Sequence, residues 1–413
     1  MDTWRVRLSL FLNFFLFAIL LNTVGIVIAQ TIVDYQVTRV QAGALEACKD
    51  LSIMVVSLLV ASYVPRFGYR RSMLAALLAV TLASMLVAAI AGFWVAPVLY
   101  LVVGSSFALM KVSVYSTVGL ITRDQRGHTG EMNLLEGIFQ VGSLTGPLLF
   151  SAMIFWSHWS NTYWLIAVLA AVALVLMLST PLDESEARSG AAQAGLGQML
   201  GLLKVPMVWV FVVCAWLYVM IEQSFGTWLP TFNREIFGFS QARSAALLSL
   251  FAGSIAASRF LAGALVRRVS WLALQVTYLG AAFVLTLAVV LVTGGGAAAS
   301  AGGGGGAVGW AGSPLLAYAF SLVGFFLGPI YPTISSIVLS HLEKSRHSAM
   351  TGLIIIFSAL GGTTGSLLVG FFSQRYSTHD AFYFPLVPIT LLALILFPYK
   401  RLSDRFGREH GTA

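Results

Sequence analysis

Long apolar runs recur along the 413-residue chain and are separated by short polar stretches. Each run is long enough to cross about 30 Å of hydrocarbon as a helix. Helix is the expected structure because backbone groups in lipid must be paired within their own segment, and barrel strands would alternate in polarity. The pattern predicts an all-α membrane protein with 12 transmembrane helices, at about 8–31, 43–64, 72–94, 97–121, 132–155, 162–180, 206–230, 243–266, 270–292, 314–340, 349–373 and 381–399.

The composition is that of a chain solvated mainly by lipid. Hydrophobic residues make up 58% of the sequence and charged residues only 10%, whereas soluble domains carry about 25% charged residues. The first apolar run is too long for the hydrophobic region of a typical signal peptide, although Val27-Ile28-Ala29 resembles a cleavage site. We therefore expect this run to be the first span.

Lysines and arginines are unevenly distributed between the two sides of the predicted spans. With the N-terminus placed in the cytoplasm, 17 of the 24 lie in cytoplasmic segments, and four lie outside, namely Arg39, Arg234, Arg243 and Arg375. This bias follows the positive-inside rule and predicts that both termini are cytoplasmic. It also accounts for the formal net charge of +8 without a nucleic acid partner.

Similar short segments occur at corresponding places in the two parts of the chain. Gly142-Ser-Leu-Thr-Gly146-Pro147-Leu-Leu149 is matched by Gly361-Gly-Thr-Thr-Gly365-Ser366-Leu-Leu368, and Thr23-Val-Gly25 by Ser224-Phe-Gly226. Together with six spans in each part, these matches predict two pseudo-symmetric halves. Halves of this kind form a central site between them, and rocking of one half against the other opens the site to either side.

Two stretches are expected to connect other elements. Residues 181–205 form the predicted cytoplasmic linker between an N-terminal half at 1–180 and a C-terminal half at 206–413. Residues 294–312 are rich in glycine and alanine, and we expect them to form a flexible outer loop.

The loop between the second and third predicted spans contains Ala61-Ser-Tyr-Val-Pro65-Arg66-Phe-Gly68-Tyr69-Arg70-Arg71. This segment resembles the loop signature of the major facilitator superfamily. Three of its residues match that signature, namely Arg66, Gly68 and Arg70. Pro65 stands where the family has an acidic residue, which puts the usual inter-helix charge contact in doubt. The resemblance extends over essentially the whole chain. It implies a transporter in which spans one, four, seven and ten line a central cavity.

Charged side chains within the predicted spans are the strongest functional candidates, because a charge at mid-bilayer costs roughly 2.5–3.5 kcal/mol. Lys111 lies near the middle of the fourth span, and Tyr115 follows one turn later on the same face. We expect Lys111 to bind an anionic group of a solute or to pair with Asp50 of the second span. Protonation of Asp50 would then release the lysine. Glu46 is a second candidate for proton coupling, or it pairs locally with Lys49.

Further polar residues lie in spans that the family resemblance places at the cavity or at the domain boundary. Glu222 of the seventh span is expected to carry a proton or contact the solute, since burial favours the neutral form of a carboxyl group. Asn22 and Tyr331 are predicted solute contacts, although such groups more often join helices by hydrogen bonds. Glu136 and Arg259 are expected to pair as a cytoplasmic gate, or Arg259 acts within its own half.

These features predict a secondary active transporter, not an enzyme, that moves a small organic solute by alternating access and proton-coupled symport. Lys111 favours an anionic solute. A proton-driven drug or metabolite exporter of the same fold is the alternative, and the partial antiporter motif at Gly142-x3-Gly146-Pro147 favours it. A membrane enzyme or receptor is disfavoured, because the sequence has neither a His-Glu-x-x-His helix nor a phosphate-binding Gly-x4-Gly-Lys loop.

The expected energy source is a proton gradient, and we predict no cofactor and no metal site. The expected partners are the small-molecule solute, protons and the lipid bilayer, with no nucleic acid. We expect a monomeric, multi-pass protein of a bacterial inner membrane.

Overall fold

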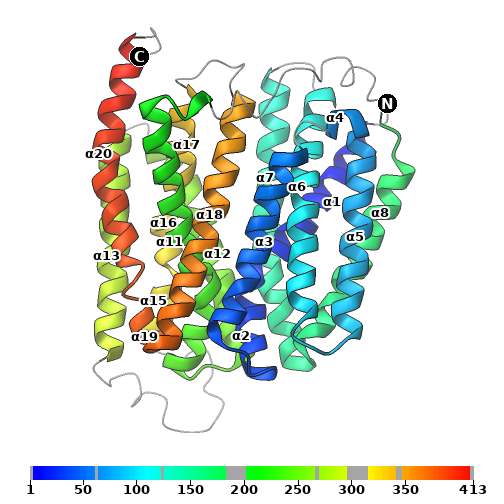
Figure 1. The fold of residues 1–413 in the computed structure, drawn as a ribbon, viewed down its shortest axis with the longest axis horizontal. Helices are drawn as coiled ribbons and strands as arrows, with labels where there is room; N and C mark the ends of the chain where they lie inside the picture. The colour runs from blue at the N-terminus through cyan, green and yellow to red at the C-terminus, as the bar shows by residue number, and fades with distance from the viewer. Residues whose placement is uncertain are drawn as a thin grey trace. The chain divides into compact units, whose positions relative to one another are not determined.

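The computed structural model describes residues 3–60, 64–121, 125–182, 201–265, 269–294, 315–340 and 347–409. Every regular element in these ranges is a helix (Figure 1), so the all-α prediction is confirmed. Ten stretches of the described chain are long and apolar enough to cross a membrane. The predicted spans at 43–64 and 243–266 form helices but are not among these ten. The count of 12 spans and the placement of the termini stay predictions.

Contacts between residues divide the chain into two compact units. Unit 1 comprises Met1–Val27 and Cys48–Leu196, and unit 2 comprises Ile28–Ala47 and Gly197–Ala413. The boundary after Leu196 lies in the predicted linker, most of which is outside the described residues, as is most of the predicted outer loop at 294–312. The grouping differs from a division at the linker alone, because residues 28–47 contact unit 2.

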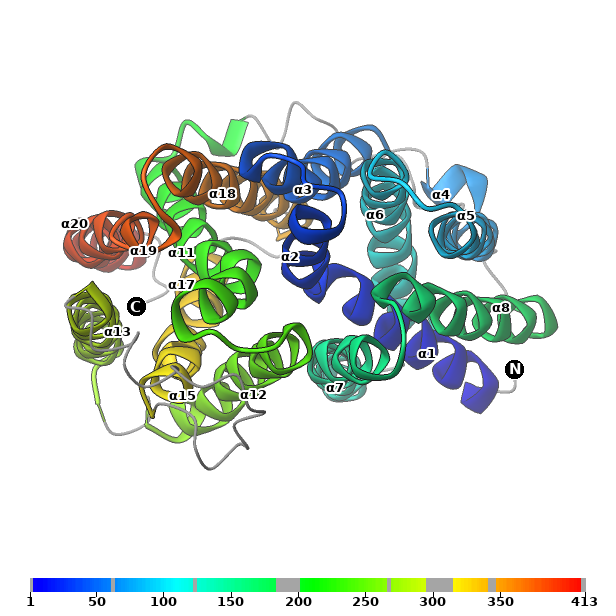
Figure 2. The same ribbon diagram turned by 90° about the horizontal axis from the view of Figure 1, so that it is seen from below.

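Unit 1 is built around two sets of neighbouring helices. The first helix, α1, packs along α7 and also contacts α8, whereas α5 lies beside both α6 and α8 (Figure 2). Buried apolar side chains of these helices, such as Phe17, Leu77 and Val103, form the core of the unit. The elements are α1 (Thr3–Asn22), α2 (Val24–Asp34), α3 (Arg39–Val60), α4 (Val64–Phe67), α5 (Tyr69–Ala89), α6 (Val95–Ile121), α7 (Gln125–Trp156), η1 (Trp159–Asn161) and α8 (Thr162–Ser179). Of these, α2 and α3 are shared with unit 2.

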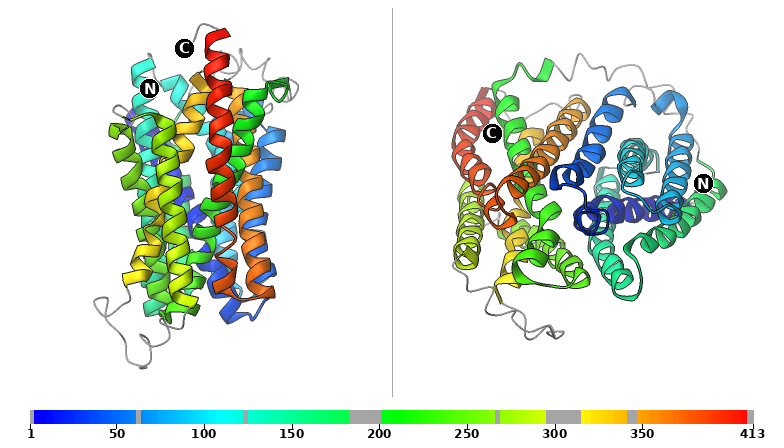
Figure 3. Two further views of the ribbon diagram at one scale, coloured as in Figure 1. Left: turned by 90° about the vertical axis from the view of Figure 1, so that its left-hand side faces the viewer. Right: turned by 60° about the horizontal axis from the view of Figure 1, so that its bottom comes forward.

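Unit 2 is centred on its longest helix, α11, which packs along α18 and contacts α20, α12 and α17. Helix α13 lies beside α20 (Figure 3) and also contacts α16. The elements are α11 (Pro206–Phe237), α12 (Gln241–Leu265), α13 (Trp271–Gly294), α15 (Leu315–Ser321), α16 (Val323–Leu327), α17 (Ile330–Ser340), α18 (His347–Arg375), α19 (Thr378–Ala381) and α20 (Leu386–Glu409).

Two glycines of α7 allow this helix to approach α1 closely. A Cβ atom at Gly142 would lie 2.6 Å from the carbonyl oxygen of Phe15, and one at Gly146 would lie 3.3 Å from that of Ile19. Contacts under 3.0 Å require the neighbouring atoms to shift. Small residues four apart are a common means of bringing membrane helices together, and here they set the separation of α7 and α1.

The matching glycines of α18 have the same packing role in unit 2. A Cβ atom at Gly361 would lie 2.4 Å from the carbonyl oxygen of Trp216, and one at Gly365 would lie 2.3 Å from that of Met220. Both oxygens belong to α11, the helix that begins unit 2 along the sequence after the linker. The repeated Gly-x3-Gly segments of the sequence therefore serve equivalent helix pairs in the two units.

Candidate functional site

Lys111 of α6 lies among aromatic rings in unit 1. Its Nζ atom is 5.7 Å from the ring centroid of Phe107 and 5.6 Å from that of Tyr115. These distances are in the range of cation–π attraction, which contributes about 0.5–2 kcal/mol. The lysine is half-buried. Within the described residues it makes no hydrogen bond or ion pair.

The rings that contact Lys111 belong to a larger aromatic group contributed by three helices. Phe14 of α1 lies 5.8 Å from Tyr115 and 6.0 Å from Phe139 of α7, whereas Phe17 lies 5.9 Å from Phe107. Phe14, Phe17 and Phe107 are buried. These rings hold the lysine in an apolar environment and leave its positive charge without a counterion from the described chain.

Tyr115 joins Lys111 to a carboxylate. The Tyr115 hydroxyl donates a hydrogen bond to Oε1 of Glu136 on α7, and the Tyr115 ring faces the Lys111 ammonium group. The prediction placed Lys111 and Tyr115 on one face of the helix, and the structure brings them together. It adds Glu136 to this group, which the sequence alone did not indicate.

The expected contact between Lys111 and Asp50 is not formed. Oδ1 of Asp50 lies 3.4 Å from Nζ of Lys49, its neighbour in the chain, and both side chains are almost fully buried. Among the residues that the structure describes, the interactions of the Lys111 ammonium group are instead those with the Phe107 and Tyr115 rings. The helical rise placed Asp50 and Lys111 at compatible depths, but it could not fix the rotation of α3 relative to α6.

A second polar group lies in unit 2, on α11, α12, α17 and α18. The rings of Tyr218 and Tyr331 stack with centroids 5.5 Å apart, and the Tyr331 hydroxyl is 3.2 Å from Oγ of Ser358. Glu222 and Arg259 lie close enough to Tyr218 to interact with it electrostatically. Three predicted site residues, Glu222, Arg259 and Tyr331, thus lie near a buried tyrosine that the sequence analysis did not single out.

Two other predicted site residues donate hydrogen bonds to backbone carbonyl oxygens. Nδ2 of Asn22 donates to the carbonyl oxygen of Ala18 on its own helix, at 2.9 Å. Nε of Arg259 donates to the carbonyl oxygen of Gly328, at 3.1 Å. Glu46 is buried in the part of α3 that belongs to unit 2. Glu136 and Arg259 belong to different units, so their pairing as a gate stays a prediction.

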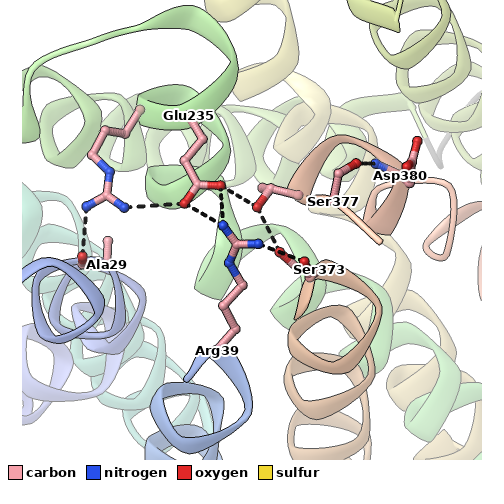
Figure 4. Close-up of polar contacts among 8 residues, drawn as sticks. Ala29, Arg39, Glu235, Ser373, Ser377 and Asp380 are labelled. Carbon is pink, nitrogen blue, oxygen red and sulfur yellow. Dashed lines mark hydrogen bonds and ion pairs between the residues drawn. The ribbon is translucent and has the colours of Figure 1, made fainter. Parts of the chain in front are cut away.

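A network centred on Glu235 binds the Ile28–Ala47 segment to the rest of unit 2 (Figure 4). Both Glu235 oxygens accept from Nη2 of Arg39, at 2.9 and 2.8 Å, and Nη1 of Arg39 donates to the Ser373 carbonyl oxygen at 2.7 Å. The hydroxyl of Thr378 also donates to Glu235, at 2.5 Å. Arg234 donates from Nη1 to the carbonyl oxygen of Ala29 at 3.0 Å.

The sequence analysis missed this network. It treated Arg39 and Arg234 as outer charges, and it did not consider Glu235. The partners of Glu235 are Arg39, 196 positions earlier, and Thr378, 143 positions later. The only local signal was the Asn233-Arg234-Glu235 run of polar residues at the end of an apolar helix.

The long apolar helices are those of an integral, multi-pass membrane protein, and the family that the chain matches is one of transporters. The chain belongs to the Major Facilitator Superfamily, whose family model matches residues 10–309. Bypass of stop codon protein 6 of Saccharomyces cerevisiae is 20% identical over 420 residues, which cover 94% of this chain and 80% of that protein.

Two solved transporters share the fold. A bacterial homologue of the human lysosomal transporter Spinster, in an inward-facing and occupied conformation, superposes with a TM-score of 0.79 at 12% identity and covers 97% of both chains. The nucleoside transporter NupG superposes with a TM-score of 0.72 at 15% identity, covering 97% of this chain and 99% of NupG. At these identities the likeness concerns the fold.

Proposed function

We propose that this transporter moves a small organic anion together with protons, and that Lys111 binds the anionic group of the solute. The observation that carries this proposal is the environment of the lysine. Its ammonium group is held by the faces of Phe107 and Tyr115 and has no ionic partner among the described residues.

Electrostatics favours an anion at this position. A charge within a membrane-spanning helix costs roughly 2.5–3.5 kcal/mol near mid-bilayer, and aromatic faces offset about 0.5–2 kcal/mol of that cost. An anionic solute supplies the remaining stabilisation as a charge-assisted hydrogen bond to the ammonium group. The surrounding rings then pack against the apolar part of the solute.

Contact of Tyr331 and Glu222, in the polar group of unit 2, with the solute stays a prediction from the sequence. Tyr331 presents a ring and a hydroxyl group, and Glu222 provides a carboxyl group that carries a proton in one of its states. The proton gradient supplies the energy in this proposal, and uptake of protons accompanies uptake of the solute.

Alternating access requires α2 and α3 to change shape or contacts. Both helices are divided between the two units, at Val27 and Ile28 in α2 and at Ala47 and Cys48 in α3. A movement of one unit against the other therefore bends these helices or breaks the contacts of residues 28–47. The ion pair of Arg39 with Glu235 is one of these contacts, and we propose that it forms and breaks during the transport cycle.

A ligand screen on detergent-purified protein tests the role of Lys111. The panel consists of monocarboxylates, dicarboxylates, sugar acids, phosphate esters, neutral sugars, nucleosides and organic cations. A ligand that binds only the folded state stabilises it by about 2.7 kcal/mol at 100 times its Kd. We expect one acidic class to raise the melting temperature of the wild type but not of Lys111→Met.

The matched control is Lys204→Met, which removes an exposed lysine of unit 2 and should respond as the wild type does. Equal stabilisation of all three proteins by acidic solutes would show that Lys111 is not the anion site. Stabilisation by neutral or cationic solutes alone would contradict an anionic substrate.

A further inference from the structure

Lys111 and Glu136 contact different parts of one side chain, that of Tyr115. The ammonium group lies over the ring, 5.6 Å from its centroid, and the carboxylate accepts the hydrogen bond of the hydroxyl. Lys111 and Tyr115 are on α6, Glu136 is on α7, and all three belong to unit 1. The tyrosine is thus a direct physical connection between an acidic and a basic group.

The charge on Glu136 changes how strongly this tyrosine holds the lysine. An ionised carboxylate draws the phenolic proton toward itself, which makes the ring face more negative and strengthens its attraction for an ammonium group. A protonated Glu136 is a weaker acceptor and has no charge. The lysine then loses part of its attraction to the ring and the nearby negative charge at the same time.

We propose that Glu136 is the proton-binding group that sets the availability of Lys111 for an anion, with Tyr115 as the connecting residue. This inference rests on the proposed function of Lys111 as the anion site. Protonation of Glu136 removes a negative charge near that site and releases the lysine, so the anion binds more tightly. Because linkage is reciprocal, the bound anion favours proton uptake by Glu136 to the same extent.

Other titratable groups of the described residues also lie on or near α7. Helix α7 contacts α1, α6, α8 and η1. Arg7 of α1 is ion-paired with Glu131 of α7, while Arg5 of α1 is exposed. Tyr163 belongs to α8, and His158 is the residue before η1. Both follow the C-terminal end of α7 in the chain. On α6, Tyr115 donates its hydroxyl to Glu136 and lies with its ring against Lys111.

The geometry separates Glu136 from the acidic residues that the sequence favoured for proton coupling. Asp50 lies against Lys49, so its protonation acts on that lysine. Glu222 and Glu46 belong to unit 2. Glu136 accepts a hydrogen bond from Tyr115, a residue of unit 1 that also contacts Lys111.

The test needs no solute. Lysine side chains of the purified protein are dimethylated with carbon-13, which preserves their charge, and the Lys111 methyl signal is assigned from its absence in Lys111→Arg. Two ring faces shift this signal strongly by ring currents. We expect it to move as the pH is lowered, and to stay fixed over the same pH interval in Glu136→Gln and Tyr115→Phe.

Glu131→Gln is the control, because it removes another carboxylate of α7, whose partner is Arg7. If this variant does not fold, Asp380→Asn, which removes an exposed carboxylate, is the control in its place. The control should titrate as the wild type does. A Lys111 signal that is constant in the wild type, or that titrates unchanged in Glu136→Gln, overturns the proposal. A Lys111 signal that still titrates in Tyr115→Phe but not in Glu136→Gln refutes the connecting role of the tyrosine. These outcomes are independent of the ligand screen, which tests the anion site itself.

Discussion

Replacing Gly365 with alanine is expected to destabilise the protein, and replacing it with leucine should prevent accumulation of folded protein in the membrane. The added Cβ atom would lie 2.3 Å from the carbonyl oxygen of Met220, and a backbone oxygen within a helix cannot turn away. Helices α18 and α11 must therefore separate along their contact. Overpacking of this kind typically costs about 1–3 kcal/mol for small insertions.

Gly280→Ala is the matched control for this substitution. Gly280 is a helical glycine of α13 with nothing within 4 Å of its Cβ position, so alanine gains up to about 1 kcal/mol of helix propensity there at no steric cost. Melting temperatures in detergent should fall for Gly365→Ala and stay constant or rise for Gly280→Ala. Equal melting temperatures for the two variants would mean that α18 and α11 are not in close contact at Gly365.

Neutralising Glu235 is expected to produce the second largest effect. Glu235→Gln removes the negative charge shared by Arg39 and Arg234, and the glutamine side chain has one acceptor oxygen where the carboxylate offers two to Nη2 of Arg39. Loss of one partner of a fully buried pair costs about 3–5 kcal/mol, and exposed pairs contribute about 0–1 kcal/mol. Since the Arg39 and Glu235 side chains are 26% and 24% exposed, we expect an intermediate cost of about 1–3 kcal/mol.

A double-mutant cycle measures the coupling in this network. Arg39→Gln and Glu235→Gln should each lower the melting temperature, and the double variant should be more stable than the sum of the single effects predicts. Asp380→Asn, which removes an exposed carboxylate, serves as the control and should change stability little. Strictly additive effects of the two substitutions would show that the observed ion pair does not hold residues 28–47 in place.

The positions of the helices followed from the apolar runs, because lipid imposes both a length and a hydrogen-bonding requirement on each span. The breaks within these helices did not follow from the apolar runs. The first predicted span is divided into α1 and α2 at Thr23, whose hydroxyl donates to the carbonyl oxygen of Ile19. The tenth is divided into α15, α16 and α17. Such breaks depend on local backbone bonding, which average hydropathy does not report.

The candidate site was predictable where it depends on spacing within one helix. Tyr115 lies one turn after Lys111, and the two side chains meet, as four-residue spacing requires. Contacts between helices were not predictable from single residues. The Tyr115–Glu136 bond joins α6 to α7, and Asp50 turned out to face Lys49, because the rotation of each helix is set by packing on its neighbours.

The Gly-x3-Gly repeat was more informative than any charged residue. Charges indicate that a partner exists without identifying it, whereas glycines four apart indicate a face that another helix approaches closely. Gly146 and Gly365 both lie on such faces, and their matched places in the sequence correspond to matched helix pairs in the structure.

Solute flux in proteoliposomes tests the central claim most directly. Vesicles containing the purified protein are loaded at high pH, diluted into medium of lower pH with the acidic solute found in the ligand screen, and assayed for its accumulation. We predict accumulation by the wild type and Lys204→Met that stops when a protonophore collapses the gradient, and background levels for Lys111→Met. Wild-type accumulation by Lys111→Met, or accumulation that ignores the proton gradient, would contradict proton-coupled transport of an anion bound at Lys111.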